Sequence, residues 1–186
     1  MSSTPTLQDV SAQVRNALRE IPDYPKPGIL FYDITTILEN AQCLHNVIAF
    51  WKARYIDQNI THIVGIESRG FTFGSALAYA LGVGFIPVRK KGKLPFTTYS
   101  QEYELEYGTD TLEIHTDAFA SMQDSGKKAR VVLVDDLLAT GGTAAASIKL
   151  IEKAGGECVE ACFLIRLSEL NGEQKLTTPF ISILDC

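Results

Sequence analysis

The hydrophobic pattern of the chain alternates between short apolar runs and longer helix-forming segments. Uninterrupted apolar runs of about four residues are typical of strands that are buried on both faces of a sheet. The segments between them are rich in Ala and other helix-forming residues. The predicted order is a strand at 62–66, a helix at 71–81, strands at 85–88 and 131–134, a helix at 142–154 and a strand at 158–164. Strands and helices in this order predict an α/β fold with a parallel, doubly wound sheet flanked by helices.

Two regions outside this regular pattern are also informative. Helices are predicted at 7–20 and 41–57, and a segment rich in Pro and Gly lies between them and ends in the extended residues 29–31. Residues 92–110 fit neither the helical nor the strand period, so we expect them to form a mobile loop of the kind that often acts as a lid. No internal repeat or linker is visible, and residues 1–186 are therefore expected to form one domain.

The most informative segment is the apolar run 131–134, which leads directly into Asp135 and Asp136. Open parallel sheets bind ligands at the carboxyl ends of their strands, so the two carboxylates are expected to emerge at that edge. The next residues, 139–143, contain two glycines and two threonines and lead into a predicted helix. Backbone N–H groups at a helix N-terminus can bind a phosphate dianion. The segment therefore predicts a sugar-phosphate site.

Other glycine-rich loops fit the sequence less well. The segment has no Gly-Lys-Ser/Thr, which a P-loop needs, so an ATPase or kinase is disfavoured. Gly82 and Gly84 precede a strand rather than a helix and lack the third glycine of a dinucleotide-binding fingerprint. For the two aspartates alone, a solvated strand end is the plain alternative, but it does not account for the adjoining small-residue loop.

Composition excludes several classes of partner. The formal net charge is −5, and the only dense basic cluster lies at 89–93, which argues against a nucleic-acid-binding surface. The uncharged stretch 70–88 is long enough to span a bilayer, but its glycines and Pro87 break it into a helix, a turn and a strand, so no membrane segment is expected. No secretory signal is visible at the start, and the four cysteines have no zinc spacing. We expect a cytoplasmic protein.

Five motifs, at 23–31, 65–71, 89–95, 105–108 and 135–143, occur in the same order as in a known family. Together they make the chain resemble the type I phosphoribosyltransferases, and the adenine phosphoribosyltransferases most closely. The resemblance covers nearly the whole chain. It implies the type I phosphoribosyltransferase fold, in which a parallel sheet flanked by helices carries a small hood from the N- and C-terminal segments and a mobile active-site loop.

The same resemblance implies a reaction in purine salvage. Such an enzyme transfers the 5-phosphoribosyl group of phosphoribosyl pyrophosphate to adenine, giving AMP and pyrophosphate. Mg²⁺ is the implied cofactor, carried by substrate oxygens and water rather than by direct protein ligands. In similar enzymes the arginine of the basic cluster reaches the pyrophosphate of the neighbouring subunit, which implies a homodimer.

The resemblance also implies a role for each motif residue. Glu106 is the expected catalytic group, which handles the proton at N7 of adenine when the loop closes. The residues implied for phosphoribosyl binding are Asp135, Asp136, Ala139, Thr140, Gly141, Gly142 and Thr143. Those implied for pyrophosphate binding are Glu67, Ser68, Arg69, Arg89, Lys93 and Tyr107. Those implied for adenine binding are Leu30, Phe31, Tyr32 and Leu137, with Phe31 and Leu137 on either face of the base.

One position departs from the family pattern. Similar enzymes commonly carry Arg after the phenylalanine, and this chain has Tyr32. If the position acts through its main chain, the change is tolerated; if the arginine side chain contributes, base preference could differ. Two other functions stay open: a sister enzyme for a 6-oxopurine, and a regulatory protein that keeps the fold. The absence of an appended helix-turn-helix and the presence of Glu106 favour an enzyme over a regulator.

Overall fold

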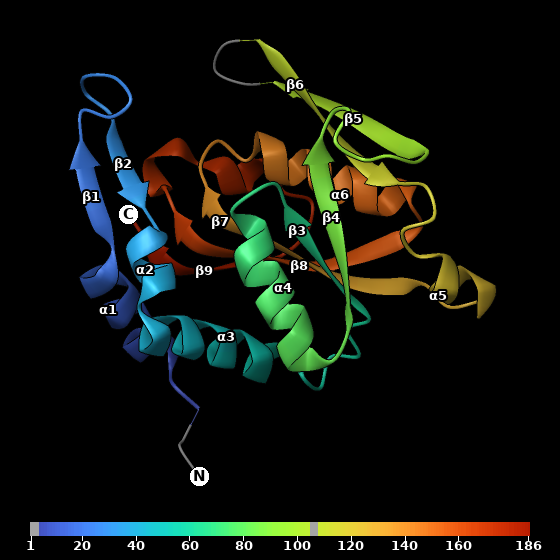
Figure 1. The fold of residues 1–186 in the computed structure, drawn as a ribbon, viewed down its shortest axis with the longest axis horizontal. Helices are drawn as coiled ribbons and strands as arrows, with labels where there is room; N and C mark the ends of the chain where they lie inside the picture. The colour runs from blue at the N-terminus through green and yellow to red at the C-terminus, as the bar shows by residue number, and fades with distance from the viewer. Residues whose placement is uncertain (1–3, 105–107) are drawn as a thin grey trace.

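The computed structural model describes residues 4–104 and 108–186. Within them, a large mixed sheet has the strand order β5-β6-β4-β3-β7-β8-β9 (Figure 1). Its strands are β3 (His62–Ile66), β4 (Gly84–Lys90), β5 (Thr98–Glu104), β6 (Thr109–His115), β7 (Ala129–Leu138), β8 (Gly156–Arg166) and β9 (Phe180–Asp185). The five strands from β4 to β9 in this order are parallel, whereas β5 and β6 pair antiparallel at one edge. The predicted α/β class with a parallel core is confirmed.

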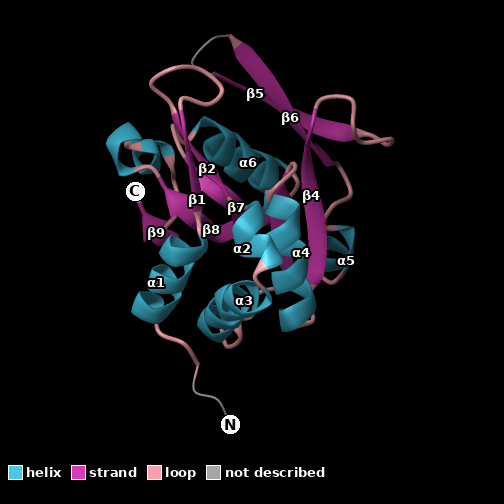
Figure 2. Cartoon of the chain, turned by 60° about the vertical axis from the view of Figure 1, so that its left-hand side comes forward, coloured by secondary structure: helices cyan, strands magenta, loops and turns pink. Residues whose placement is uncertain are grey.

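Helices cover both faces of this sheet (Figure 2). They are α1 (Leu7–Ala17), α2 (Thr35–Glu39), α3 (Ala41–Tyr55), α4 (Gly70–Leu81), α5 (Ala120–Asp124) and α6 (Gly142–Lys153). Along β7, Val132 and Val134 pack with α1, α3 and α4, while Val131 and Leu133 pack with α5 and α6. Successive side chains of a strand point to opposite faces, so this strand is buried on both sides, as its apolar run predicts.

A second, two-stranded sheet forms the hood. It consists of β1 (Arg19–Pro22) and β2 (Leu30–Asp33), which pair antiparallel. The predicted helix 7–20 is therefore too long, because Leu18 has an extended backbone and Arg19 already pairs with Asp33. The hood and the β5–β6 pair stand on opposite sides of the carboxyl edge of the sheet (Figure 1).

The expectation of a loop at 92–110 is wrong for residues 98–104 and 109–110, which form strands. Residues 98–104 form β5 and pair along their whole length with β6. The polar composition that suggested a loop is that of an edge strand, whose outer face is solvated while β-favouring Thr and Tyr side chains maintain the pairing. Glu106 and Tyr107 lie outside the described residues.

The other boundaries differ by smaller amounts. The strands β4, β7 and β8 are each longer than their apolar runs, and α3 ends at Tyr55 rather than at residue 57. The sequence analysis did not predict β9, the short helices α2 and α5, or the two 3-10 turns η1 (Ser168–Leu170) and η2 (Gly172–Lys175). Within residues 4–104 and 108–186, no helix combines the length and the apolar character needed to cross a membrane.

Candidate active site

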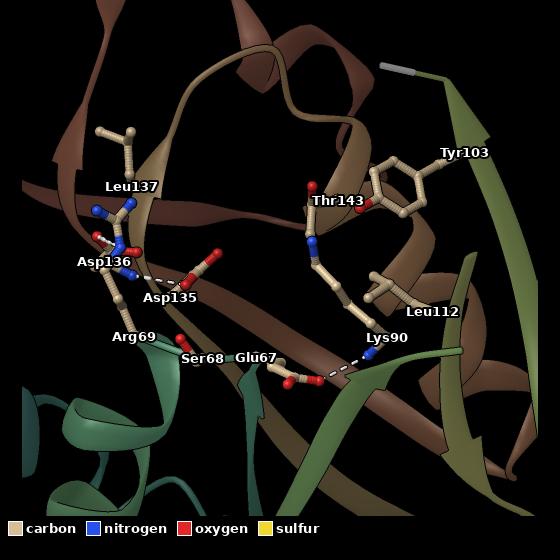
Figure 3. Close-up of a pocket in the computed structure, with 10 residues that line it drawn as sticks. All are labelled: Glu67, Ser68, Arg69, Lys90, Tyr103, Leu112, Asp135, Asp136, Leu137 and Thr143. Atoms are coloured by element: carbon tan, nitrogen blue, oxygen red, sulfur yellow. Dashed lines mark hydrogen bonds and ion pairs between the residues drawn. The ribbon is translucent and has the colours of Figure 1, made fainter. Parts of the chain in front are cut away.

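A cavity of about 570 Å³ opens at the carboxyl edge of the sheet (Figure 3). Its walls come from the ends of β3, β4 and β7, from β5 and β6, and from the start of α6. The residues that line it are Glu67, Ser68, Arg69, Lys90, Tyr103, Leu112, Asp135, Asp136, Leu137 and Thr143. Six of these ten residues are among those that the sequence motifs selected for phosphoribosyl or pyrophosphate binding, and a seventh, Leu137, was selected for the base.

The two adjacent aspartates lie within β7, which continues to Leu138, rather than beyond its end. Asp135 accepts a hydrogen bond from the N–H of Asp136 (2.9 Å), and Asp136 is paired with the Nε atom of Arg69 (2.9 Å). Burial raises the pKa of both carboxyls, the negative charge of Asp136 raises that of Asp135 further, and Arg69 opposes the rise at Asp136. Two close carboxylates in such a place can accept hydrogen bonds from ligand hydroxyls.

The loop after β7 ends in a helix N-terminus. Gly141 has a left-handed backbone (φ 76°) and is the N-cap of α6, so no side chain is present there to bond the first N–H groups of the helix. A smaller cavity of about 80 Å³ lies against the loop and is lined by Asp135 and residues 137–144. Free N–H groups at the positive end of a helix dipole bind anions. The loop can therefore hold a phosphate group beside the carboxylate pair.

The segment after β3 brings Glu67, Ser68 and Arg69 to the opposite wall (Figure 3). Glu67 accepts hydrogen bonds from the side chain of Arg89 (3.3 and 3.1 Å) and from the N–H of Lys90 (2.9 Å). The hydrogen bond from Arg89 is the main reason that the pKa of Glu67 is lowered. Glu67 is thus an ionised group that ties the end of β3 to β4 and partly neutralises the basic cluster.

The structure separates the members of the basic cluster. Arg89 also donates to the carbonyl oxygen of Lys93 (3.2 Å), and neither Arg89 nor Lys93 lines the cavity. The side chain of Lys90 points into it instead (Figure 3), with its Nζ atom 3.6 Å from Asp110. The basic cluster was predicted from the sequence, but Arg89 and Lys93 were selected from it, and it is the side chain of Lys90 that enters the cavity.

Tyr103 is a second lining residue that the sequence analysis missed. Its hydroxyl donates to Asp110 (3.3 Å) and contacts Thr143 at the start of α6. Burial raises the pKa of this tyrosine. No signal pointed to it, because residues 92–110 were expected to be a loop, and the β5–β6 pairing that places Tyr103 was not predicted.

Of the three hood residues, Phe31 approaches this region through its contact with Arg69. The guanidinium of Arg69 lies 5.8 Å from the centre of the Phe31 ring, and Tyr24 packs edge-on against the same ring at 5.1 Å. The side chain of Tyr32, on the other face of β2, packs against the core beneath the hood and beside Cys186. Leu30 remains exposed. The three hood residues do not line the large cavity.

The chain is similar to known phosphoribosyltransferases in both sequence and structure. Residues 33–179 match the model of the family described as "Phosphoribosyl transferase domain". An adenine phosphoribosyltransferase of Helicobacter pylori is 58% identical over 169 residues, covering 91% of this chain and 92% of that protein. The crystal structure of adenine phosphoribosyltransferase from Rhodothermus marinus superposes with a TM-score of 0.85 at 45% identity, covering 95% of this chain and 98% of that one.

The enzyme from Saccharomyces cerevisiae superposes with a TM-score of 0.88 at 39% identity, covering 95% of this chain and 99% of that chain. That structure is a complex with adenine and an imino-altritol bisphosphate.

Proposed function

Because this chain belongs to the phosphoribosyl transferase family, we propose that it transfers the 5-phosphoribosyl group of phosphoribosyl pyrophosphate to adenine, giving AMP and pyrophosphate. The observation that carries the proposal is the arrangement on β7, where two close carboxylates adjoin a helix N-terminus that no side chain caps. A ribose 5-phosphate carries hydroxyls for the carboxylates and a phosphate dianion for the helix N-terminus, and Asp135 lines the same small cavity as the loop. The named relatives identify the acceptor as adenine.

The sugar phosphate would be held at two points. Asp135 and Asp136 accept hydrogen bonds from the ribose hydroxyls, and Ala139, Thr140, Gly141, Gly142 and Thr143 bind the 5-phosphate. Binding at both ends fixes the anomeric carbon between the base and the leaving group. In the reaction the bond from this carbon to the pyrophosphate oxygen breaks and a bond to N9 of adenine forms. The carbon carries positive charge in between, which carboxylates beside the ribose would stabilise.

The pyrophosphate would lie toward Ser68 and Lys90, which line the far side of the cavity. Glu67, Arg89 and Lys93 support this wall, since their contacts join the ends of β3 and β4. Arg69 contacts Asp136 and the ring of Phe31, so we assign it to the boundary between ribose and base. This assignment revises the purely pyrophosphate-binding role that the motif implied.

Magnesium is the implied cofactor, and the available oxygen donors suit it. Among the residues that the structure describes, no three His, Cys, Asp or Glu side chains gather into a metal cage. Asp135, Asp136 and Glu67 do offer carboxylate oxygens around the cavity. Mg²⁺ would be bound by oxygens of the substrate and by waters that donate hydrogen bonds to these carboxylates. When bound, it would neutralise charge on the departing pyrophosphate.

Adenine would lie between Phe31 and Leu137 and be read by main-chain groups of residues 30–32. The inward packing of the Tyr32 side chain supports a main-chain role for that position, so its departure from the usual arginine should leave the preference for adenine intact. Glu106 is proposed as the group that manages the proton at N7, and Tyr107 as a pyrophosphate contact. Both assignments rest on the sequence motif.

We also propose that residues 1–186 act as one domain, in a cytoplasmic homodimer. The support is the resemblance of the basic cluster to that of dimeric relatives. Sedimentation of the purified protein should give twice the mass of one chain, and a single-chain mass would contradict the dimer.

The proposal is tested by measuring nucleotide formation from phosphoribosyl pyrophosphate and Mg²⁺ with adenine, hypoxanthine, guanine and xanthine in parallel. We expect AMP from adenine and no turnover of the other three bases. Turnover of a 6-oxopurine would reassign the base pocket, and no turnover of any base would favour a regulatory protein that only binds the sugar phosphate.

A further inference from the structure

We propose that residues 168–175, which we call the backing segment, hold the phosphate-binding loop in shape from behind, and that Gly172 is a positioning residue for the 5-phosphate. The backing segment comprises η1, Asn171 and η2. None of the five sequence motifs includes it. The inference rests on the proposed function, because it concerns how the same phosphate group is bound.

Close packing between two glycines carries the inference. A Cβ atom on Gly172 would overlap the carbonyl oxygen of Ala139 and would lie 2.7 Å from the nitrogen of Gly141 and 2.9 Å from the carbonyl carbon of Thr140. In return, a Cβ on Gly141 would overlap the carbonyl oxygen of Gly172. The backbones of the loop and of the backing segment therefore touch directly, with no side chain between them.

This contact also fixes how the loop peptides face. The carbonyl of Ala139 is directed at Gly172, and in a trans peptide the following N–H points the opposite way. The N–H of Thr140 is therefore turned away from the backing segment, toward the side from which an anion can approach. A loop free to rotate this peptide would offer a carbonyl oxygen to the phosphate instead, and a carbonyl repels an anion.

The backing segment is itself firmly attached. The N–H of Leu167 donates to the carbonyl oxygen of Leu138 at the end of β7 (2.9 Å), and the N–H of Ser168 donates to that of Cys186 (2.8 Å). Arg166 makes two hydrogen bonds with Asp185 (3.1 and 2.8 Å) and lies 3.8 Å from a carboxylate oxygen of Glu173 in η2. The segment is thus joined to β7, β8 and β9 and can resist displacement of the loop.

The sharpest test is the variant Gly172→Ala. The φ angle of Gly172 lies outside the left-handed region, so alanine meets no left-handed strain there, and the three atoms nearest to its Cβ all belong to the backbone of the loop. We expect the KM for phosphoribosyl pyrophosphate to rise about tenfold or more, with kcat and the KM for adenine changed less than about twofold. An unchanged KM for phosphoribosyl pyrophosphate would overturn the proposal.

Direct binding separates a specific effect on the phosphate from general damage. AMP and adenosine differ only in the phosphate, so the ratio of their dissociation constants isolates its contribution. In Gly172→Ala, the ratio of the dissociation constant of adenosine to that of AMP should fall about tenfold. The control is Gly126→Ala, which is strained by a φ of 69° but has open space around it and precedes β7, at the other end of this strand from the loop. It should leave the ratio unchanged. Equal ratios in wild type and Gly172→Ala would overturn the proposal.

A measurement on the wild-type protein decides the matter if Gly172→Ala does not fold. AMP should slow amide hydrogen exchange in both 139–143 and 168–175, whereas adenosine should not. Protection of 139–143 alone would overturn the proposal. These outcomes differ from failure of the proposed function, which would appear as absence of AMP formation, or of AMP binding, in the wild-type protein.

Discussion

Asp135 and Asp136 lie where burial raises the pKa of each carboxyl, and Arg69 is in contact with only one of them. A carboxyl whose pKa is higher in the folded than in the unfolded protein lowers stability at every pH above its unfolded-state pKa, and by the full amount above its folded-state pKa. At neutral pH this pair therefore destabilises the unliganded protein. The ribose hydroxyls of the substrate would donate the hydrogen bonds that these carboxylates lack in the unliganded protein. The site therefore lowers the stability of the free protein and favours substrate binding.

The variant Asp135→Asn tests whether the charge of Asp135 lowers stability and favours substrate binding. The amide keeps an oxygen that can accept the hydrogen bond from the N–H of Asp136, but it carries no charge. We expect the melting temperature of the unliganded protein at neutral pH to rise by about 2–4 °C, which corresponds to roughly 1 kcal/mol in a chain of this size. We also expect kcat/KM for phosphoribosyl pyrophosphate to fall by about 10- to 100-fold, since a hydrogen bond to a charged acceptor is lost.

The pH dependence has a definite sign. Below the raised folded-state pKa, Asp135 is protonated in the wild type, and its cost to stability shrinks as the pH falls further toward the unfolded-state pKa. The stability advantage of the variant should shrink over the same range. Differential scanning calorimetry of both proteins between neutral and acidic pH measures this difference. A variant that is less stable than the wild type at neutral pH would contradict the account.

The roles of single residues could be predicted where the residues of one site are contiguous in the sequence. The aspartate pair and the loop 139–143 are contiguous, and the need for a phosphate site could be read from them. The pairing of Arg69 with Asp136 could not be predicted, because these residues are distant in the sequence. The entry of Lys90 rather than Arg89 into the cavity depends on the direction of one side chain at the end of β4.

At the scale of elements, the start of α4 packs directly against the catalytic end of β7. A Cβ on Gly70 would lie 2.7 Å from the carbonyl oxygen of Val134 and 2.9 Å from a carboxylate oxygen of Asp135. Glycine there lets the segment 67–70 approach the carboxylate pair closely. The distance between the two walls of the cavity thus depends on one missing methyl group.

Gly70→Ala is expected to destabilise the protein by about 1–3 kcal/mol, because the backbone oxygen of Val134 cannot move aside. It should also raise the KM for phosphoribosyl pyrophosphate. The control is Gly74→Ala in the same helix, where the nearest atom, 3.0 Å away, belongs to the side chain of Phe85, which can shift. Thermal unfolding and steady-state kinetics measure both effects. If Gly70→Ala and Gly74→Ala lose the same stability and show the same KM for phosphoribosyl pyrophosphate, a special role for Gly70 is contradicted.

Elements were predictable where a local pattern dictates them. The buried strands β3 and β7 and the helices α4 and α6 appeared at the expected places because continuous apolar runs and helix-forming segments are local signals. The β5–β6 pair was not predicted because β5 is largely polar and shows no apolar run. The helix that was expected to continue to residue 20 ends early, since Arg19 pairs with Asp33.

At the scale of the whole molecule, strand order determines the site. Neighbouring β4, β3 and β7 bring Lys90, Ser68 and the aspartate pair to one edge, and the hood and the β5–β6 pair stand on either side of it (Figure 1). The parallel core follows from alternating strands and helices. The antiparallel edge depends on the pairing of two largely polar strands, which the apolar pattern does not reveal. The backing segment depends on its contact with a loop that is distant in the sequence.

The most direct test of the account is a crystal structure of the protein with AMP, which carries the phosphate, the ribose and the base in one molecule. The account predicts the phosphate against the N–H groups of 139–143, the ribose hydroxyls at Asp135 and Asp136, and the adenine ring between Phe31 and Leu137. A phosphate bound elsewhere, or a base directed away from the hood, would contradict it.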